Sequence, residues 1–245
     1  MLNKIRECEL KETELFGKNV LAVYNEICNL IDIIYGKNEY DDIDWDFFDI
    51  KGTVLLYGIP GGGKTTLIKN CLNRALNLYG TESYYIETSN IIRSNLGEST
   101  SRMNRALQEF HEKEEGILFI DEIDKVCVNR KNIDEISELK RMLIELMAGI
   151  DRLNMSSKKI IIGCTNVFEQ LDEALIRRFT ICREIKEPSY EEKVNFFRLC
   201  MGKCGKIVGN VQEYNELLKN LKTMDSIKQL FRDSILSKST NLLEM

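Results

Sequence analysis

The sequence predicts an α/β fold in which a five-stranded parallel sheet is covered by helices on both faces and is followed by a small helical domain. Three observations lead to this prediction. Five short apolar segments alternate with helical patterns, a glycine-rich loop directly follows the first segment, and the pattern becomes purely helical after Glu187-Pro188. Short apolar runs that alternate with helices are typical of parallel strands buried on both faces.

The five expected strands are the most apolar short stretches of the chain. They span residues 54–57, 84–87, 117–120, 160–164 and 181–185. Between the third and fourth, apolar residues recur every three to four positions over residues 139–150, which predicts a helix packed on the sheet. A chain of 245 residues has room for one such core and a small second one.

The boundaries follow from these patterns. We expect residues 1–15 to be a polar leader, residues 16–186 to form the large domain, and residues 187–245 to form a helical lid. The lid begins with Ser189-Tyr190-Glu191-Glu192, which is a capping box that starts a helix. Two further helical patterns follow it along the chain.

The glycine-rich loop has the spacing of a phosphate-binding loop. Its sequence is Gly58-Ile59-Pro60-Gly61-Gly62-Gly63-Lys64-Thr65, and Thr66 continues into an amphipathic helix. Glycines let backbone N–H groups turn inward around a triphosphate, and the following helix adds the positive end of its dipole. We therefore expect this loop to bind ATP, with Lys64 reaching the outer phosphates and Thr65 offering its hydroxyl to Mg²⁺.

An acidic pair ends the third expected strand. Gly116-Ile117-Leu118-Phe119-Ile120 runs directly into Asp121-Glu122. An isolated pair of this kind also occurs where a strand meets a helix cap, but together with a phosphate-binding loop it indicates catalysis. We expect Asp121 to hold Mg²⁺ and Glu122 to polarise the attacking water.

Two further polar features follow along the chain. Asn166 ends the fourth expected strand, where it would orient the attacking water or contact the γ-phosphate if that strand lies between the other two. Asparagine also ends strands as a plain turn residue. Arg177 and Arg178 end a short helical segment, and they either pair with surface carboxylates or stabilise charge in phosphoryl transfer.

In this order, these features resemble the AAA+ ATPases of the subgroup that includes katanin, spastin and NSF. The matching segments are residues 58–65, 96–99, 121–122, 166, 171–179 and 225–233. The resemblance implies a P-loop NTPase fold, Mg²⁺-dependent ATP hydrolysis, and a homo-oligomeric ring, usually a hexamer, in which Arg177 and Arg178 reach the neighbouring subunit's nucleotide. It also implies that Phe16 and Gly17 contact the adenine.

The same resemblance implies a motor that remodels, unfolds or disassembles a protein substrate, recruited through an adaptor. In such motors an aromatic residue in a central-pore loop grips the polypeptide, whereas here Asn95 takes that position and Leu96 is the apolar residue at the loop tip. The alternative is therefore an ATP-dependent assembly switch or loader that acts on a partner protein or nucleic-acid complex without processive threading.

Composition excludes several other classes. The formal net charge is −5 and charges of both signs alternate without long single-sign blocks, so nothing in the composition suggests a nucleic-acid or anionic-membrane surface, although it is compatible with a local basic patch. No stretch approaches the roughly 18 apolar residues that span a bilayer, and the charged first residues do not suggest a secretory signal. We expect a cytoplasmic protein.

Overall fold

The computed structural model describes residues 2–36, 43–91, 98–126, 133–205 and 211–237, and its centre is a six-stranded sheet. The strand order is β1-β3-β4-β5-β2-β6. The bounds are β1 (Asn3–Lys4), β2 (Thr53–Tyr57), β3 (Ser83–Glu87), β4 (Gly116–Asp121), β5 (Lys159–Thr165) and β6 (Ile181–Glu184). The five expected strands are confirmed and are mutually parallel.

The leader adds the sixth strand. β1 pairs antiparallel with β3, and the chain then forms a short 3₁₀ segment, η1 (Glu7–Glu9). Leu10 is buried in the core, and the Thr13 N–H donates to Asn70 Oδ1 at 2.9 Å. Residues 1–15 were expected only as a polar leader. These contacts join the leader backbone to β3 and to Asn70 of α2, which lie far away in sequence, so no local pattern predicts them.

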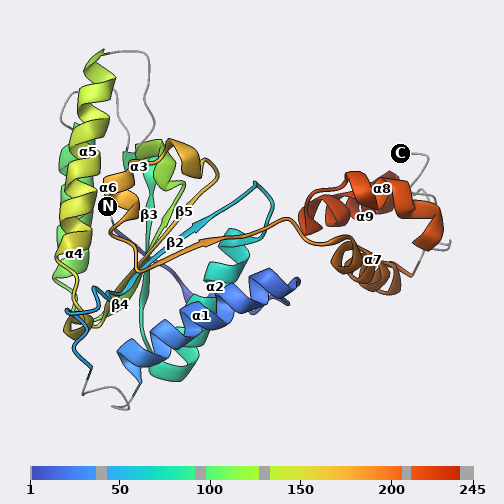
Figure 1. The fold of residues 1–245 in the computed structure, drawn as a ribbon, viewed down its shortest axis with the longest axis horizontal. Helices are drawn as coiled ribbons and strands as arrows, with labels where there is room; N and C mark the ends of the chain where they lie inside the picture. The colour runs from blue at the N-terminus through green and yellow to red at the C-terminus, as the bar shows by residue number, and fades with distance from the viewer. Residues whose placement is uncertain (1, 37–42, 92–97, 127–132, 206–210, 238–245) are drawn as a thin grey trace.

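Helices cover both faces of the sheet (Figure 1). α1 (Lys18–Tyr35) and α2 (Lys64–Tyr79) lie on one face, and α4 (Glu98–His111) and α5 (Ile133–Asp151) lie on the other. In β2, Val54 and Leu56 pack toward the first pair of helices, while Leu55 packs toward the second. Successive side chains of a strand point to opposite faces, and here both faces are buried. The sequence of β2 is therefore a continuous apolar run.

Short elements complete the large domain. They are α3 (Thr88–Ile91), α6 (Glu173–Ile176), η2 (Ile123–Val126), η3 (Met155–Ser157) and η4 (Phe168–Gln170). α6 comes immediately before β6, and η2 immediately follows the acidic end of β4. η2 therefore lies beside the candidate site, whereas α6 leads to the start of β6, at the opposite edge of the sheet.

In the described part of the segment expected as a lid, three helices follow β6 and stand apart from the sheet in Figure 1. They are α7 (Tyr190–Cys204), α8 (Asn215–Asn220) and α9 (Met224–Ser237), with η5 (Val211–Tyr214) before α8. Their small core contains Phe197, Tyr214 and Phe231. The predicted capping box at Ser189 and Glu192 is confirmed. Phe16 contacts the lid, with its ring edge-on to Phe196 at 4.6 Å between centroids.

The strand order brings the candidate catalytic residues to one edge. β5 lies between β4 and β2, as the interpretation of Asn166 required. Because the carboxyl ends of parallel strands meet at the same edge, the phosphate-binding loop, Asp121 and Asn166 are neighbours there. Within the described ranges, no helix is long and apolar enough to cross a membrane.

Candidate nucleotide site

A pocket of about 370 Å³ lies between the glycine-rich loop, the ends of β4 and β5, the leader and the lid. Its lining residues are Glu14, Leu15, Phe16, Val20, Pro60, Gly61, Gly62, Gly63, Lys64, Thr65, Thr66, Asp121, Glu122, Asn166, Phe196, Met224, Asp225 and Lys228. One end is polar and glycine-rich, and the other carries aromatic and aliphatic side chains. A nucleotide has the same two-ended chemistry, with charged phosphates and an apolar base.

The loop conformation depends on glycine at two points. Gly63 caps α2 in the left-handed region with φ 94° and offers no side chain, so the first N–H groups of the helix have no capping partner there. At Gly58, with φ 138°, an added Cβ would lie 2.4 Å from the Ile185 carbonyl oxygen. The loop can therefore present helix N–H groups to an anion while passing close to the end of β6.

Lys64 lines the pocket and is only 7% exposed. Its ammonium donates to the carbonyl oxygens of Gly58 at 2.7 Å and Ile59 at 3.0 Å. Burial lowers the pKa of Lys64, partly opposed by the acidic group Asp121 nearby. Added negative charge in the pocket would favour the charged ammonium, so the site is electrostatically suited to phosphate.

The acidic end of β4 is held by short-range contacts. Asp121 Oδ1 accepts from the Glu122 N–H at 2.9 Å and from the Cys164 thiol at 2.7 Å. Burial raises the pKa of Cys164, so the sulfur keeps its proton and donates. Glu122 has φ 50°, a conformation that costs energy in a non-glycine residue. Its carboxylate forms an ion pair with Lys125.

The turn that carries Asn166 is fixed from both sides. The Thr165 hydroxyl donates to Asp124 Oδ1 at 2.6 Å and accepts from the Val167 N–H at 3.0 Å. Phe168, which follows, stacks on Tyr57 of β2 with 3.9 Å between ring centroids. The acidic segment after β4 and the end of β2 therefore both hold the position of Asn166.

Not every expected residue lines this pocket. Phe16 does, but Gly17 caps α1 behind it, and Gly58 contributes the carbonyl that accepts from Lys64. Asn95 and Leu96 fall outside the described residues.

Sequence reasoning missed part of the pocket wall. Lys228 of α9 lines the pocket, with its ammonium 5.7 Å from the centre of the Phe196 ring, and Leu15 and Val20 line it from the leader and α1. Lys228 and Val20 belong to ordinary helical patterns and Leu15 precedes α1, so only tertiary packing reveals their position.

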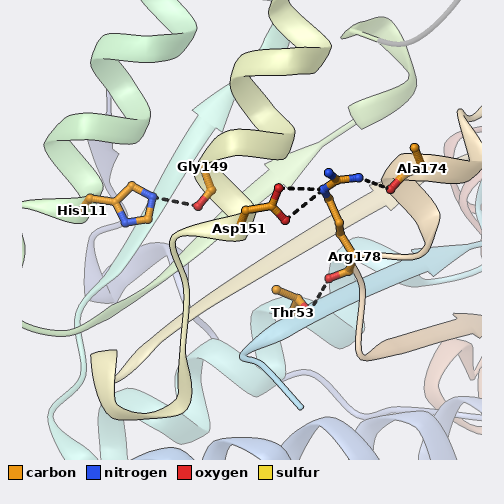
Figure 2. Close-up of polar contacts among 6 residues, drawn as sticks. All are labelled: Thr53, His111, Gly149, Asp151, Ala174 and Arg178. Atoms are coloured by element: carbon orange, nitrogen blue, oxygen red, sulfur yellow. Dashed lines mark hydrogen bonds and ion pairs between the residues drawn. The ribbon is translucent and has the colours of Figure 1, made fainter. Parts of the chain in front are cut away.

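The two arginines lie outside the chain's own pocket. The Arg177 side chain is 80% exposed, and its only described ionic contact is Glu173 at 3.4 Å. Arg178 instead donates from Nε to both carboxylate oxygens of Asp151, at 2.9 and 3.1 Å, and from Nη1 to the Ala174 carbonyl at 2.6 Å (Figure 2). The two arginines therefore differ. The Arg177 guanidinium is exposed to solvent, whereas that of Arg178 is hydrogen-bonded within its own chain.

Comparison with known proteins decides the family. The family model described as "ATPase family associated with various cellular activities (AAA)" matches residues 54–187, which contain the phosphate-binding loop, the acidic pair, Asn166 and both arginines. The chain belongs to the AAA ATPase family. Membership implies nucleotide binding and ATPase activity.

Individual relatives of this AAA ATPase agree. It is 32% identical over 152 residues to a proteasome-activating nucleotidase of Archaeoglobus fulgidus, which covers 60% of this chain and 37% of that protein. It is 31% identical over 197 residues to the ATP-dependent zinc metalloprotease FtsH 2 of a Thermoanaerobacter species, covering 77% and 36%. The chain thus spans about a third of the length of these relatives.

A solved structure shares the fold across the large domain and the lid. It is a chain of the HORMA:CdnC:Trip13 complex from E. coli MS115-1, with a TM-score of 0.73 and 18% identity. The match covers 97% of this AAA ATPase and 88% of that chain. At this identity the likeness bears on the fold alone.

Proposed function

We propose that this AAA ATPase is a Mg²⁺-dependent, ATP-hydrolysing motor that assembles into a ring and remodels, unfolds or disassembles a protein partner. The observation that carries the proposal is the convergence of Lys64, Asp121, Glu122 and Asn166 on one pocket. This set contains each type of group that phosphoryl transfer to water requires of its own subunit: a cradle for phosphate, an oxygen ligand for Mg²⁺, a base, and a group that orients water.

The residues fit a bound Mg²⁺. Thr65 offers a hydroxyl and Asp121 a carboxylate in the same pocket, and both are the hard oxygen ligands that Mg²⁺ prefers. Among the described residues, no group of three or more His, Cys, Asp or Glu side chains is arranged to hold a metal. This agrees with an ion held by one or two protein ligands together with phosphate oxygens and water. When bound, Mg²⁺ would neutralise charge that develops on the phosphates.

Glu122 is the proposed general base. Its carboxylate is paired with Lys125 in this structure, so it must exchange that partner for the attacking water. Asn166 would hold the same water from the neighbouring strand. A positioned base contributes about 10²–10⁴-fold to a rate, so replacing Glu122 should leave binding intact and remove most turnover.

The remaining charge would come from another protomer. Because neither Arg177 nor Arg178 lines the chain's own pocket, we propose that the arginine pair acts on the nucleotide of an adjacent copy. An arginine finger supplied in this way contributes about 10³–10⁵-fold. Hydrolysis would therefore require assembly, and the ring would be a homo-oligomer, most simply a hexamer.

The proposed substrate is a protein. Support comes from the relatives, whose names are those of a proteasome-activating nucleotidase and an ATP-dependent protease. Asn95, in place of a pore aromatic residue, favours a second candidate function, in which ATP times assembly on a partner protein or nucleic acid without pulling on it. An adaptor that recruits the substrate belongs to the proposed remodelling motor and not to this second candidate function.

One experiment tests both the chemistry and the partner. Purified wild-type protein and Glu122→Gln are assayed for ATP binding and for phosphate release, with Mg²⁺ or with a chelator, and Glu216→Gln on α8 serves as a matched surface control. We expect wild type and Glu216→Gln to hydrolyse ATP only with Mg²⁺, and Glu122→Gln to bind ATP without turnover. Capture on Glu122→Gln with ATP should then retain the protein partner. Turnover at the wild-type rate in Glu122→Gln would contradict the assignment.

A further inference from the structure

The end of α6 presents its two arginines differently. Leu175 is fully buried and Phe179 is 7% exposed, so the residues between them lie on a segment anchored at both ends. Within it, the Arg177 side chain is 80% exposed, and that of Arg178 is 31% exposed. Arg178 also makes three side-chain hydrogen bonds within its own chain (Figure 2).

Asp151 is an unusual residue at its position. It is the last residue of α5, where the negative end of the helix dipole disfavours an acid, and the last turn contains no basic residue. The Arg178 guanidinium supplies the missing positive charge there, with Nε 2.9 and 3.1 Å from the two carboxylate oxygens. The carboxylate and the helix end together therefore favour a cation at this point.

The end of α5 is itself fixed. His111 Nε2 lies 2.9 Å from the Gly149 carbonyl oxygen, which joins the last turn of α5 to the end of α4 (Figure 2). An added Cβ at Gly149 would lie 3.0 Å from Leu107, so the two helices are in close contact here. The backbone that carries Asp151 is therefore held in place, although the Asp151 side chain itself is 47% exposed.

The backbone of Arg178 is held as well. Its carbonyl oxygen accepts from the Thr53 hydroxyl at 3.0 Å, and Thr53 Oγ1 accepts in turn from the Thr180 N–H at 2.9 Å. Thr53 is fully buried and begins β2, the strand that leads into the phosphate-binding loop. Arg178 thus joins the ends of α5 and α6 to the start of β2.

We propose that Asp151 and Arg178 are positioning residues that fix the direction in which Arg177 projects toward a neighbouring protomer, and that Arg178 does not itself contact that protomer's nucleotide. The proposal rests on the shared site described under the proposed function and divides the arginine pair into one acting and one supporting residue. To reach a neighbour, Arg178 would have to give up all three side-chain hydrogen bonds, whereas Arg177 has one long contact to an exposed acid.

The test uses mixed assemblies in which only one kind of site can turn over. The acceptor subunit is Arg177→Ala, which keeps its own pocket but offers no free guanidinium. The donor subunit is Glu122→Gln, which holds ATP without hydrolysing it and keeps Arg177. Each alone should be inactive, and the mixture should release phosphate from acceptor sites next to donor subunits. An inactive mixture would overturn the shared site and this proposal with it.

The donor is then varied. We expect Asp151→Ala and Arg178→Ala in the donor each to lower kcat of the mixture by about 10–100-fold, because a displacement of about 1 Å at the reacting centre costs up to about 10²-fold. The double substitution should be no worse than either single one, and the KM of the acceptor sites for ATP should not change. Glu216→Ala in the donor removes an exposed ion pair with Lys219 on α8, so it is the matched control and should change kcat less than about twofold.

A different result would refute the supporting role. If Asp151→Ala donors were as active as the parent while Arg178→Ala donors were inactive, Arg178 would act on the nucleotide directly. Asp151→Asn provides a milder variant with nearly the same shape, for which we expect an intermediate loss of kcat. ATP binding to each donor alone checks that its fold and its own pocket are intact, and full activity of Asp151→Asn and Asp151→Ala donors alike would also overturn the proposal.

Discussion

Glu192 connects the lid to the large domain through hydrogen bonds. Its Oε1 accepts from the Lys18 N–H at the start of α1 at 2.6 Å, and its Oε2 accepts from the Ser189 N–H at 2.7 Å. One carboxylate therefore accepts at two helix N-termini, and its bond to Lys18 joins residues that are 174 positions apart in sequence. The ring contact between Phe16 and Phe196 supports the same junction and forms part of the nucleotide pocket.

The change Glu192→Gln keeps the shape and removes the charge. An amide has one acceptor oxygen, so one of the two N–H groups loses its partner and the other bond becomes neutral. Hydrogen bonds to charged groups contribute about 1.5–3 kcal/mol, and partial exposure of this site lets water replace some of that, which leaves a loss of about 1–2 kcal/mol. For a chain of this size, the thermal midpoint should fall by about 2–8 °C.

The pH dependence gives an independent check. The Lys18 N–H lowers the pKa of Glu192 below its ordinary value of 4.5. Because the folded-state pKa is the lower one, the stabilisation is complete above pH 4.5 and is lost as the pH falls through the folded-state pKa. The difference in thermal midpoint between wild type and Glu192→Gln should therefore be constant from pH 7 to about 5 and shrink in more acidic solution.

Differential scanning calorimetry measures both quantities, with Glu191→Gln as the matched control. Glu191 lies in the same first turn of α7 and is exposed, so we expect its replacement to change stability by less than about 0.5 kcal/mol. Equal thermal midpoints for wild type and Glu192→Gln would refute the idea that Glu192 stabilises the contact between the lid and the large domain. An equal loss of stability in Glu191→Gln and Glu192→Gln would refute it too.

Three other predictions concern the pocket and the α4–α5 contact. Lys64→Ala should weaken ATP binding by about 100-fold, because a charge-assisted phosphate contact is lost; unchanged affinity by calorimetry would discredit the phosphate site. Phe16→Ala should weaken ATP binding by about tenfold while kcat at saturation stays the same, and a fall in kcat alone would show a different role. Burial lowers the folded-state pKa of His111 below its ordinary value of 6.5. The neutral imidazole therefore stabilises the fold above pH 6.5, and this stabilisation is lost as the pH falls toward the folded-state pKa. In His111→Gln, the thermal midpoint should change less with pH between pH 6.5 and about 5 than it does in wild type. The same pH dependence in both proteins would contradict this.

The sequence predicted those features whose chemistry is local. The strand, loop and helix around Lys64 are predictable because the glycines, the lysine and the flanking apolar runs are contiguous. The same holds for the acidic end of β4 and for the capping box at Ser189. In each case, the residues that cooperate are within a few positions of one another.

The features that sequence reasoning did not find are made by residues far apart. Asp151 and Arg178 are 27 positions apart and meet only because α5 and α6 end at the same edge of the sheet. Lys228 faces the pocket only because the lid folds back over Phe16. Neither arrangement has a local pattern, since a single acid at a helix end or a single lysine in a helix is ordinary.

The most direct test of the shared active site is the ATPase rate per chain over a dilution series, measured alongside sedimentation. We predict that the rate per chain rises in parallel with the assembled fraction. In Arg177→Ala the rate should stay low at every concentration although ATP still binds. A constant rate per chain that extends to fully dissociated monomers would contradict a site completed by a neighbouring protomer.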